Sequence, residues 1–181
     1  MIKKMLMAAA FIATTFAVVL AKDTPKGTPG ESPMAAMKAE MMKCYVCKNI
    51  AAKMDEIGPR GMEPVKLNDG LAIRHWVKSD DPKRLAAFRA AGNACSKAGE
   101  ECMSFTDERA KTELCEFCQG VRTAAKAGAR MSMGQTPNGD MMVLTSADAP
   151  VQAQLATLHE KCALMASSME MPGAKTSASK E

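Results

Sequence analysis

Seven cysteines are the residues of this 181-residue chain most able to do chemistry. Four form two CxxC motifs and three stand alone: Cys44 with Cys47, Cys115 with Cys118, and Cys95, Cys102 and Cys162. Thiolates bind soft metals such as Zn(II) and Cu(I), pair as disulfides, or act as nucleophiles. An odd number of cysteines leaves one thiol over after internal pairing.

The second half of the chain offers the more complete metal-ligand set. His159 and Cys162 lie one turn apart on a stretch with helical periodicity. With Cys115 and Cys118 they form a candidate site of three cysteines and one histidine, which Zn(II) or Cu(I) would accept.

The first half supplies a counterpart built from Cys44, Cys47 and Cys95. Its fourth ligand would be Cys102 or His75. The alternative is a site of three thiolates without a fourth protein ligand. A histidine in a strand is commonly a buried, hydrogen-bonded residue, so His75 has a structural explanation as well. We therefore predict zinc or copper(I) as the cofactor, bound by cysteine and histidine.

Two other functions use the same thiols. Disulfides could tie the helices of each half into an interaction module without metal, although the second half would keep one unpaired cysteine. A thiol oxidoreductase would need an accessible cysteine of low pKa. The apolar periodicity places each CxxC inside a helix, where the helix dipole does little to lower a thiol pKa. The β-carbons of the two cysteines would be about 5–6 Å apart, too far for a disulfide within one motif.

The elements that would position these cysteines follow one order in both halves. Helical periodicity over residues 37–57 and 110–125 is followed by candidate hairpins at 65–77 and 131–144. Ser79-Asp80-Asp81-Pro82 and Ser146-Ala147-Asp148 would then cap a second helix in each half. The pattern Ser104 to Asp107 predicts a capping box at the start of the third helix.

The recurrence of this order predicts an internal repeat. An offset of 67 aligns Ser79 with Ser146 and Cys95 with Cys162, and an offset of 71 aligns the CxxC motifs. Copies at 34–104 and 105–171 would each be an αββα unit. The expected fold is one α+β domain, with an antiparallel sheet covered by the helices that carry the cysteines.

The junction between hairpin and second helix carries a resemblance. A glycine turn, a strand and then Thr145-Ser146-Ala147-Asp148 or Lys78 to Pro82 resembles a unit of uncharacterised exported bacterial proteins. The resemblance covers about 25 residues of each copy. It supports the repeat and implies no activity.

The first 21 residues predict export, and the segments at both ends of the mature chain predict disorder. Residues 1–21 have two lysines, an apolar stretch and Val19-Leu20-Ala21 at the expected cleavage point, which is typical of a signal peptide. Residues 22–33 and 172–181 are rich in Pro, Gly, Ser and Lys and predict disordered segments. We expect a periplasmic or extracellular protein without a membrane span after cleavage, whose thiols meet an oxidising compartment.

Charge and motif content narrow the function further. A net charge of +4 without a basic block disfavours nucleic acid as a partner. The chain contains no CxxCH, HExxH, GxSxG or glycine-rich phosphate loop, and we predict that it is not an enzyme. Seventeen methionines add soft thioether ligands or fill a core with few aromatic residues. The predicted partners are a metal ion and another exported protein.

Overall fold

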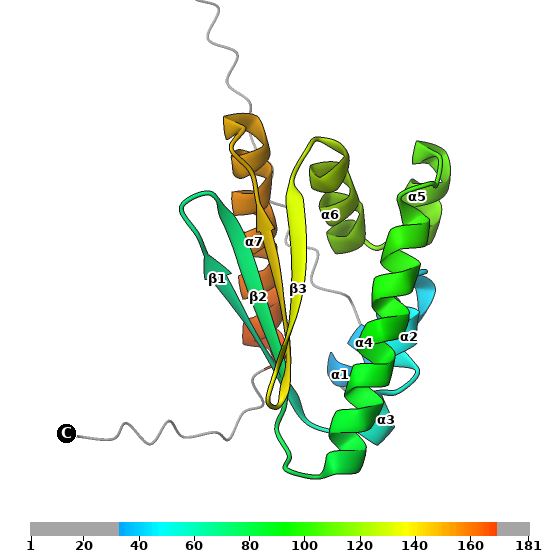
Figure 1. Ribbon diagram of the computed structural model, residues 1–181. Helices are drawn as coiled ribbons and strands as arrows, with labels where there is room; N and C mark the ends of the chain where they lie inside the picture. Colours follow the sequence, from blue (N-terminus) through cyan, green and yellow to red (C-terminus); the bar gives the residue numbers. More distant parts are fainter. Residues whose placement is uncertain (1–32, 170–181) are drawn as a thin grey trace, which may run out of the picture.

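The structure is a computed structural model that describes residues 33–169 (Figure 1). These residues form an antiparallel sheet and seven helices, which confirms the α+β prediction. The predicted signal peptide 1–21, the predicted tail 172–181 and all of the predicted linker except Pro33 lie outside the described residues. The internal repeat remains a prediction.

Both predicted hairpins are present and join into one sheet. The four strands are β1 (Arg60–Lys66), β2 (Gly70–Val77), β3 (Arg130–Thr136) and β4 (Gly139–Thr145). Their order is β1-β2-β4-β3, so the second strand of each hairpin lies in the centre. Strands β2 and β4 pair with Leu71 opposite Leu144 and Ile73 opposite Met142. The two halves of the chain are therefore joined through the middle of the sheet.

The helices are shorter than predicted around the CxxC motifs. They are α1 (Pro33–Lys43), α2 (Lys48–Ala51), α3 (Met54–Ile57), α4 (Pro82–Cys102), α5 (Asp107–Glu113), α6 (Glu116–Lys126) and α7 (Ala149–Met169). The predicted continuous helices over 37–57 and 110–125 are wrong, because the chain turns at each CxxC motif. Within residues 33–169, no helix is both long enough and apolar enough to cross a membrane.

The predicted caps of the two long helices are confirmed. The Asp81 carboxylate accepts a hydrogen bond from the backbone N–H of Lys83 at 2.9 Å, and that of Asp148 accepts one from Val151 at 3.2 Å. Such bonds satisfy backbone donors that a helix leaves free in its first turn. The capping box predicted from Ser104 is replaced by Thr106, whose hydroxyl accepts from the N–H of Arg109.

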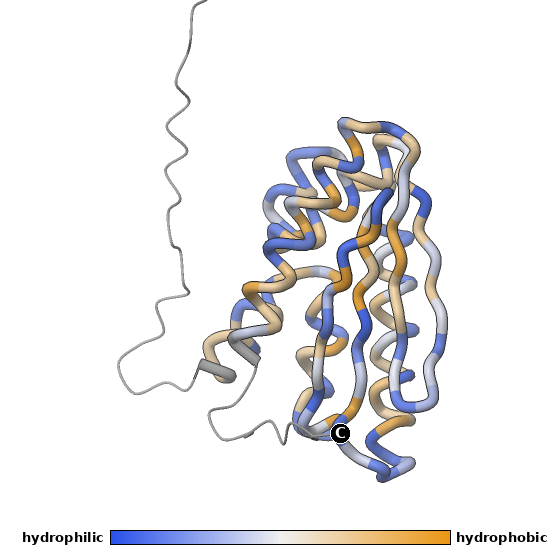
Figure 2. Tube along the Cα trace, turned by 90° about the vertical axis from the view of Figure 1, so that its left-hand side faces the viewer, coloured by the Kyte–Doolittle hydropathy of each residue, from blue (hydrophilic) through white to orange (hydrophobic). Residues whose placement is uncertain are grey.

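Apolar side chains of the sheet pack against the two long helices. Helix α7 buries Leu155 and Leu158 against Leu71, Ile73 and Leu144 of the central strands. Helix α4 packs Phe88 against Val77 and Ile57 of the first half. Figure 2 shows hydrophobic positions along the strands and helices, with hydrophilic positions between them. A third buried cluster surrounds the CxxC motifs, away from the sheet.

Candidate metal centre

Four cysteine sulfurs from the two halves of the chain lie together. They belong to Cys44, Cys47, Cys115 and Cys118, and all four Sγ atoms are within 4.8 Å of one another. The Sγ atom of Cys47 is 3.5 Å from that of Cys118 and 3.7 Å from that of Cys115. These separations are those of neighbouring thiols, since a disulfide requires about 2.05 Å. No other group of three or more Cys, His, Asp or Glu side chains in residues 33–169 has metal-binding proximity.

The first CxxC motif occupies the turn between α1 and α2. The backbone N–H of Cys44 donates to the carbonyl of Met41 at 3.2 Å, which closes the end of α1. The carbonyl of Cys44 accepts from Lys48 at 3.0 Å, and that of Cys47 accepts from Ala51 at 3.0 Å. Cys47 is thus the N-cap residue of α2. The turn directs two sulfurs toward the second motif.

The second CxxC motif begins helix α6. The backbone is extended at Leu114 and at Cys115, with ψ angles of 139° and 163°, so α5 ends and α6 starts at this point. Cys115 is the N-cap residue, and Cys118 lies in the first turn of α6. The side-chain amide of Gln119 donates to the carbonyl of Leu114 at 2.7 Å and fixes the junction.

A backbone hydrogen bond joins the two motifs directly. The N–H of Tyr45, inside the first motif, donates to the carbonyl of Glu113 at 2.7 Å, just before the second. The Tyr45 ring meets Phe105 edge to face, with ring centroids 5.1 Å apart. Phe105, Ala110 and Leu114 bury the cluster on one side. The sulfurs are therefore held by packing and backbone contacts as well as by their own proximity.

Exposure divides the four cysteines into two pairs. Cys44 is 2% exposed and Cys118 is 8% exposed. Cys47 and Cys115 are half-buried. Each motif thus supplies one buried and one half-buried cysteine.

The four thiols perturb one another strongly. Hydrogen bonding to neighbouring thiols, Cys115 above all, lowers the pKa of Cys44, and hydrogen bonding to Cys118 lowers that of Cys115. The pKa values of Cys47 and Cys118 are raised, first by interaction with Cys115 and further by burial. Some of the four thiols therefore ionise readily and make the others harder to ionise. A bound cation would stabilise the thiolate form of all four cysteines at once.

The three remaining cysteines lie in different surroundings. Burial raises the pKa of Cys95 and of Cys162 to about 11, and it also raises that of Cys102. The thiol of Cys95 donates to the carbonyl of Val46 at 3.4 Å, and that of Cys102 donates to Gly99 at 3.0 Å. Burial thus disfavours the thiolate form of each, which is the form that binds metal.

The grouping of predicted ligands differs from that in the structure. Cys162 is fully buried among apolar residues that join α7 to the sheet, and His159 is half-buried on the same helix. Neither belongs to the sulfur cluster, and neither does Cys95. The prediction grouped the cysteines within each half, but helix α6 places its N-terminus beside the first motif instead. The repeated CxxC spacing was itself a signal for one set of four cysteines.

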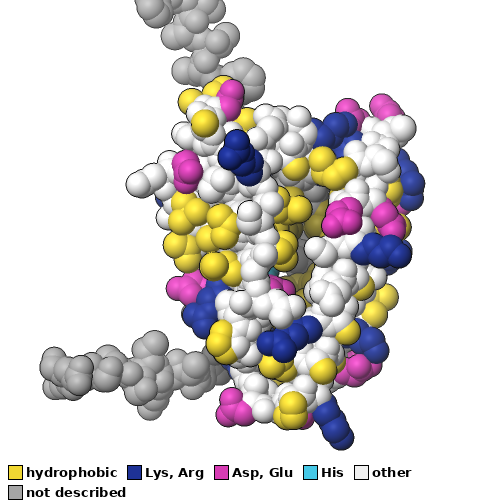
Figure 3. Space-filling view, viewed as in Figure 1, with side chains coloured by type: hydrophobic (Ala, Val, Ile, Leu, Met, Phe, Trp, Pro, Cys, Tyr) yellow, Lys and Arg dark blue, Asp and Glu magenta, His cyan; other side chains and the backbone are white. Residues whose placement is uncertain are grey.

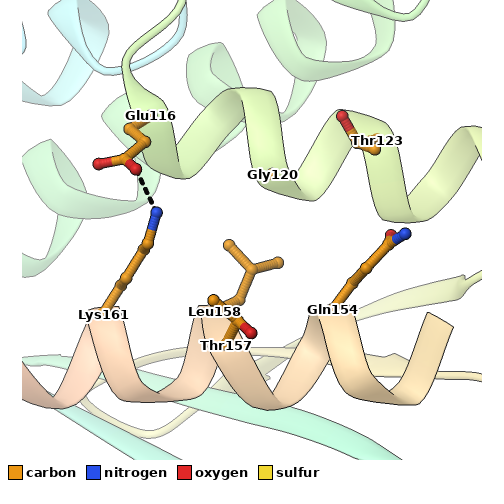
Figure 4. A pocket seen from close by; sticks show the side chains of 7 residues that line it. All are labelled: Glu116, Gly120, Thr123, Gln154, Thr157, Leu158 and Lys161. Atoms are coloured by element: carbon orange, nitrogen blue, oxygen red, sulfur yellow. Dashed lines mark hydrogen bonds and ion pairs between the residues drawn. The ribbon is translucent and has the colours of Figure 1, made fainter. Parts of the chain in front are cut away.

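Helix α6 rests on α7 along a shallow groove (Figure 4). The groove has a volume of about 240 Å³, below the about 300–1,000 Å³ of most ligand sites. Leu158 points toward Gly120, and an ion pair between Lys161 and Glu116 lies at one end. A β-carbon added at Gly120 would lie 2.5 Å from the Leu158 side chain, so glycine permits this close approach. The contact sets the position of the helix that carries Cys115 and Cys118.

Comparison with protein-family models, curated proteins and solved structures gives no match. The resemblance to exported bacterial proteins remains a prediction. The functional argument therefore rests on the geometry of the four sulfurs.

Proposed function

We propose that this chain is an exported, non-enzymatic protein that binds a soft metal ion through Cys44, Cys47, Cys115 and Cys118. One observation carries the proposal. In a tetrahedral zinc tetrathiolate with Zn–S bonds of about 2.3 Å, neighbouring sulfurs are about 3.8 Å apart. The separations of 3.5 and 3.7 Å from Cys47 to Cys118 and Cys115 are close to that value.

The donor set favours zinc over copper. Four thiolates in tetrahedral arrangement suit Zn(II), and also iron, whereas Cu(I) binds thiolates without needing four of them. Zinc has no redox chemistry of its own, and structural zinc sites bind it through four protein ligands. We therefore expect zinc as the resident metal, with copper(I) as the competing ion.

Full coordination supports a structural role. Four protein ligands leave no open position for water or substrate, which catalytic zinc sites retain. The bound ion would cross-link the turn before α2 to the start of α6, far apart along the chain. Its binding free energy would then add to the stability of the fold.

Export and partners are part of the same proposal. The predicted signal peptide, residues 1–21, would deliver the thiols to the periplasm or exterior, which is an oxidising compartment. Figure 3 shows acidic and basic side chains interspersed on the face in view, a pattern unlike the basic patches that bind phosphates. A metal ion is the principal partner, and another exported protein is the second.

Metal content and free thiols, measured on the same exported sample, test the proposal. We expect about one zinc per chain and seven free thiols after metal removal without reductant. Cys95→Ala and Cys162→Ala should keep the metal, and Cys44→Ala and Cys118→Ala should lose it. A metal-free chain with its CxxC cysteines in disulfides would contradict the proposal and favour the disulfide-stapled module.

One observation favours thiol oxidoreductase activity as the second candidate. Cys115 lies at the N-terminus of α6, is half-buried and has a lowered pKa, which is the setting of a reactive thiol. The sequence argument against this activity placed the motif inside a helix and is wrong for this motif. Catalysed reduction of insulin disulfides, abolished by Cys115→Ser, would support an oxidoreductase over a structural metal site.

A further inference from the structure

The half-buried cysteine of each CxxC motif lies next to that of the other motif. Cys47 and Cys115 are both half-buried, and their Sγ atoms are 3.7 Å apart. Cys44 and Cys118 form the inner pair, with exposures of 2% and 8%. The more exposed cysteine of each motif therefore lies beside that of the other motif, where a small oxidant from solvent would reach both.

We propose that peroxides oxidise Cys47 and Cys115 first, joining the two motifs by a disulfide and releasing the metal from the four-cysteine site. This inference rests on the proposed function, because it describes how the same site would be regulated. The oxidant is a hydroperoxide, of which hydrogen peroxide is the simplest.

The chemistry balances in two steps. The thiolate of Cys115 attacks one peroxide oxygen, the O–O bond breaks, and a proton completes a sulfenic acid and one water. The Cys47 thiolate then attacks that sulfur, the S–O bond breaks, and a second proton leaves with the oxygen as water. Two thiolates, one hydrogen peroxide and two protons give one disulfide and two waters. The sulfurs lose two electrons, the peroxide gains them, and the metal loses two ligands.

Backbone position supports formation of this bond. Cys47 precedes α2 and Cys115 precedes α6, so each lies at the end of an element rather than within one. Bond formation must shorten a 3.7 Å contact to about 2.05 Å. Such a change is within reach of side-chain rotation and small adjustments at two turns.

The three cysteines outside the four-cysteine cluster lack either exposure to solvent or a place among the clustered sulfurs. Cys102 and Cys162 are 4% and 0% exposed, so peroxide reaches them slowly. Cys95 is half-buried, but its thiol bonds to the carbonyl of Val46, and it lies outside the cluster of sulfurs.

Disulfide mapping on the zinc-loaded mature chain tests the proposal. Less than one equivalent of hydrogen peroxide is added, released zinc is followed with a chromogenic chelator, and remaining thiols are then alkylated. Trypsin cleaves at Lys43 and Lys48, while chymotrypsin cleaves after Tyr45 and Phe117 and so separates the two cysteines of each motif. We expect the Cys47–Cys115 peptide to appear first, in step with zinc release, and both to reverse with a thiol reductant.

Matched variants and the metal-free chain separate this proposal from the metal proposal. Cys95→Ala should behave as the parent, and the Cys44→Ala/Cys118→Ala double variant should lose zinc yet still form the Cys47–Cys115 disulfide. Failure to bind zinc would overturn the proposed function, while mapping on the reduced metal-free chain would still decide the order of oxidation. A first disulfide of any other pairing, or no oxidation at a dose that oxidises glutathione, would overturn this inference.

Discussion

The surroundings of each cysteine separate the candidate ligands from the other thiols. The sulfurs of Cys44, Cys47, Cys115 and Cys118 share one cluster, where their ionisation is mutually coupled. Cys162 is more deeply buried than any of them, yet it belongs to the apolar cluster formed by the sheet, α6 and α7. Sequence spacing alone ranked Cys162 with the ligands, because it lies one turn after His159.

Removal of a ligand should therefore differ from removal of a core thiol. Cys118→Ala should weaken zinc binding by more than about 100-fold, since loss of an outer-shell partner alone costs about 10–100-fold. Cys162→Ala should leave zinc affinity unchanged while lowering the free energy of unfolding, because it opens a cavity in the core. Competition with a chromogenic chelator, combined with urea unfolding, measures both effects. Equal loss of affinity in the two variants would contradict the assignment.

Asp107 gives a residue-scale prediction about pH. A hydrogen bond from Arg122, supported by Lys126, lowers the pKa of Asp107. A depressed carboxyl pKa stabilises the fold above the unfolded pKa, and that contribution is lost as pH falls through the folded pKa.

We therefore expect the parent to be more stable than Asp107→Asn at about pH 6, and the difference to shrink below about pH 4. Urea unfolding across this range measures it, and Glu108→Gln on the same helix is the control. A difference independent of pH would show that the charge of Asp107 is not responsible.

At the scale of elements, local signals predicted the hairpins and the caps but not the breaks at the CxxC motifs. The Asn/Asp-Gly sequences mark the two hairpin turns. The aspartates before α4 and α7 form capping hydrogen bonds with nearby backbone N–H groups, so both signals can be found in the local sequence. The apolar periodicity continues through Cys44 and Cys47, and the sequence contains no glycine or proline there. Tertiary contacts, including the bond from Tyr45 to Glu113, set the turn instead.

The contact between α6 and α7 gives a prediction at this scale. Gly120→Ala gains helix propensity, but overlap of the added β-carbon with the Leu158 side chain should cost about 1–3 kcal/mol and offset that gain. Gly99→Ala in α4 is the matched control, since nothing lies within 4 Å of its added β-carbon and alanine favours helix. It should stabilise the fold by about 0.5–1 kcal/mol. Thermal unfolding of both variants measures the difference, and equal effects would contradict close packing of α6 on α7.

At the scale of the whole molecule, the two halves meet twice. Strands β2 and β4 pair in the centre of the sheet, and the two CxxC motifs meet away from it. The sequence predicted the content of each half, including both hairpins and both CxxC motifs. It did not determine which half supplies the partner of each motif, because that depends on how α6 leaves α5 and packs on α7.

Metal removal should weaken the whole fold. An ion present at about 100 times its dissociation constant stabilises the native state by about 2.7 kcal/mol, and tighter binding adds to this. Treatment with a strong zinc chelator should therefore lower the midpoint of thermal unfolding of the parent. The Cys44→Ala/Cys118→Ala double variant should show no such shift, and a shift of equal size in it would indicate that the chelator acts elsewhere.

The coordination shell of the bound metal tests the central claim most directly. X-ray absorption spectroscopy at the zinc edge distinguishes sulfur from nitrogen ligands by scattering strength and distance. The structure predicts four sulfurs at about 2.3 Å and no imidazole. A shell of three sulfurs and one nitrogen at about 2.0–2.1 Å would contradict the four-cysteine site and return His159 to the ligand set.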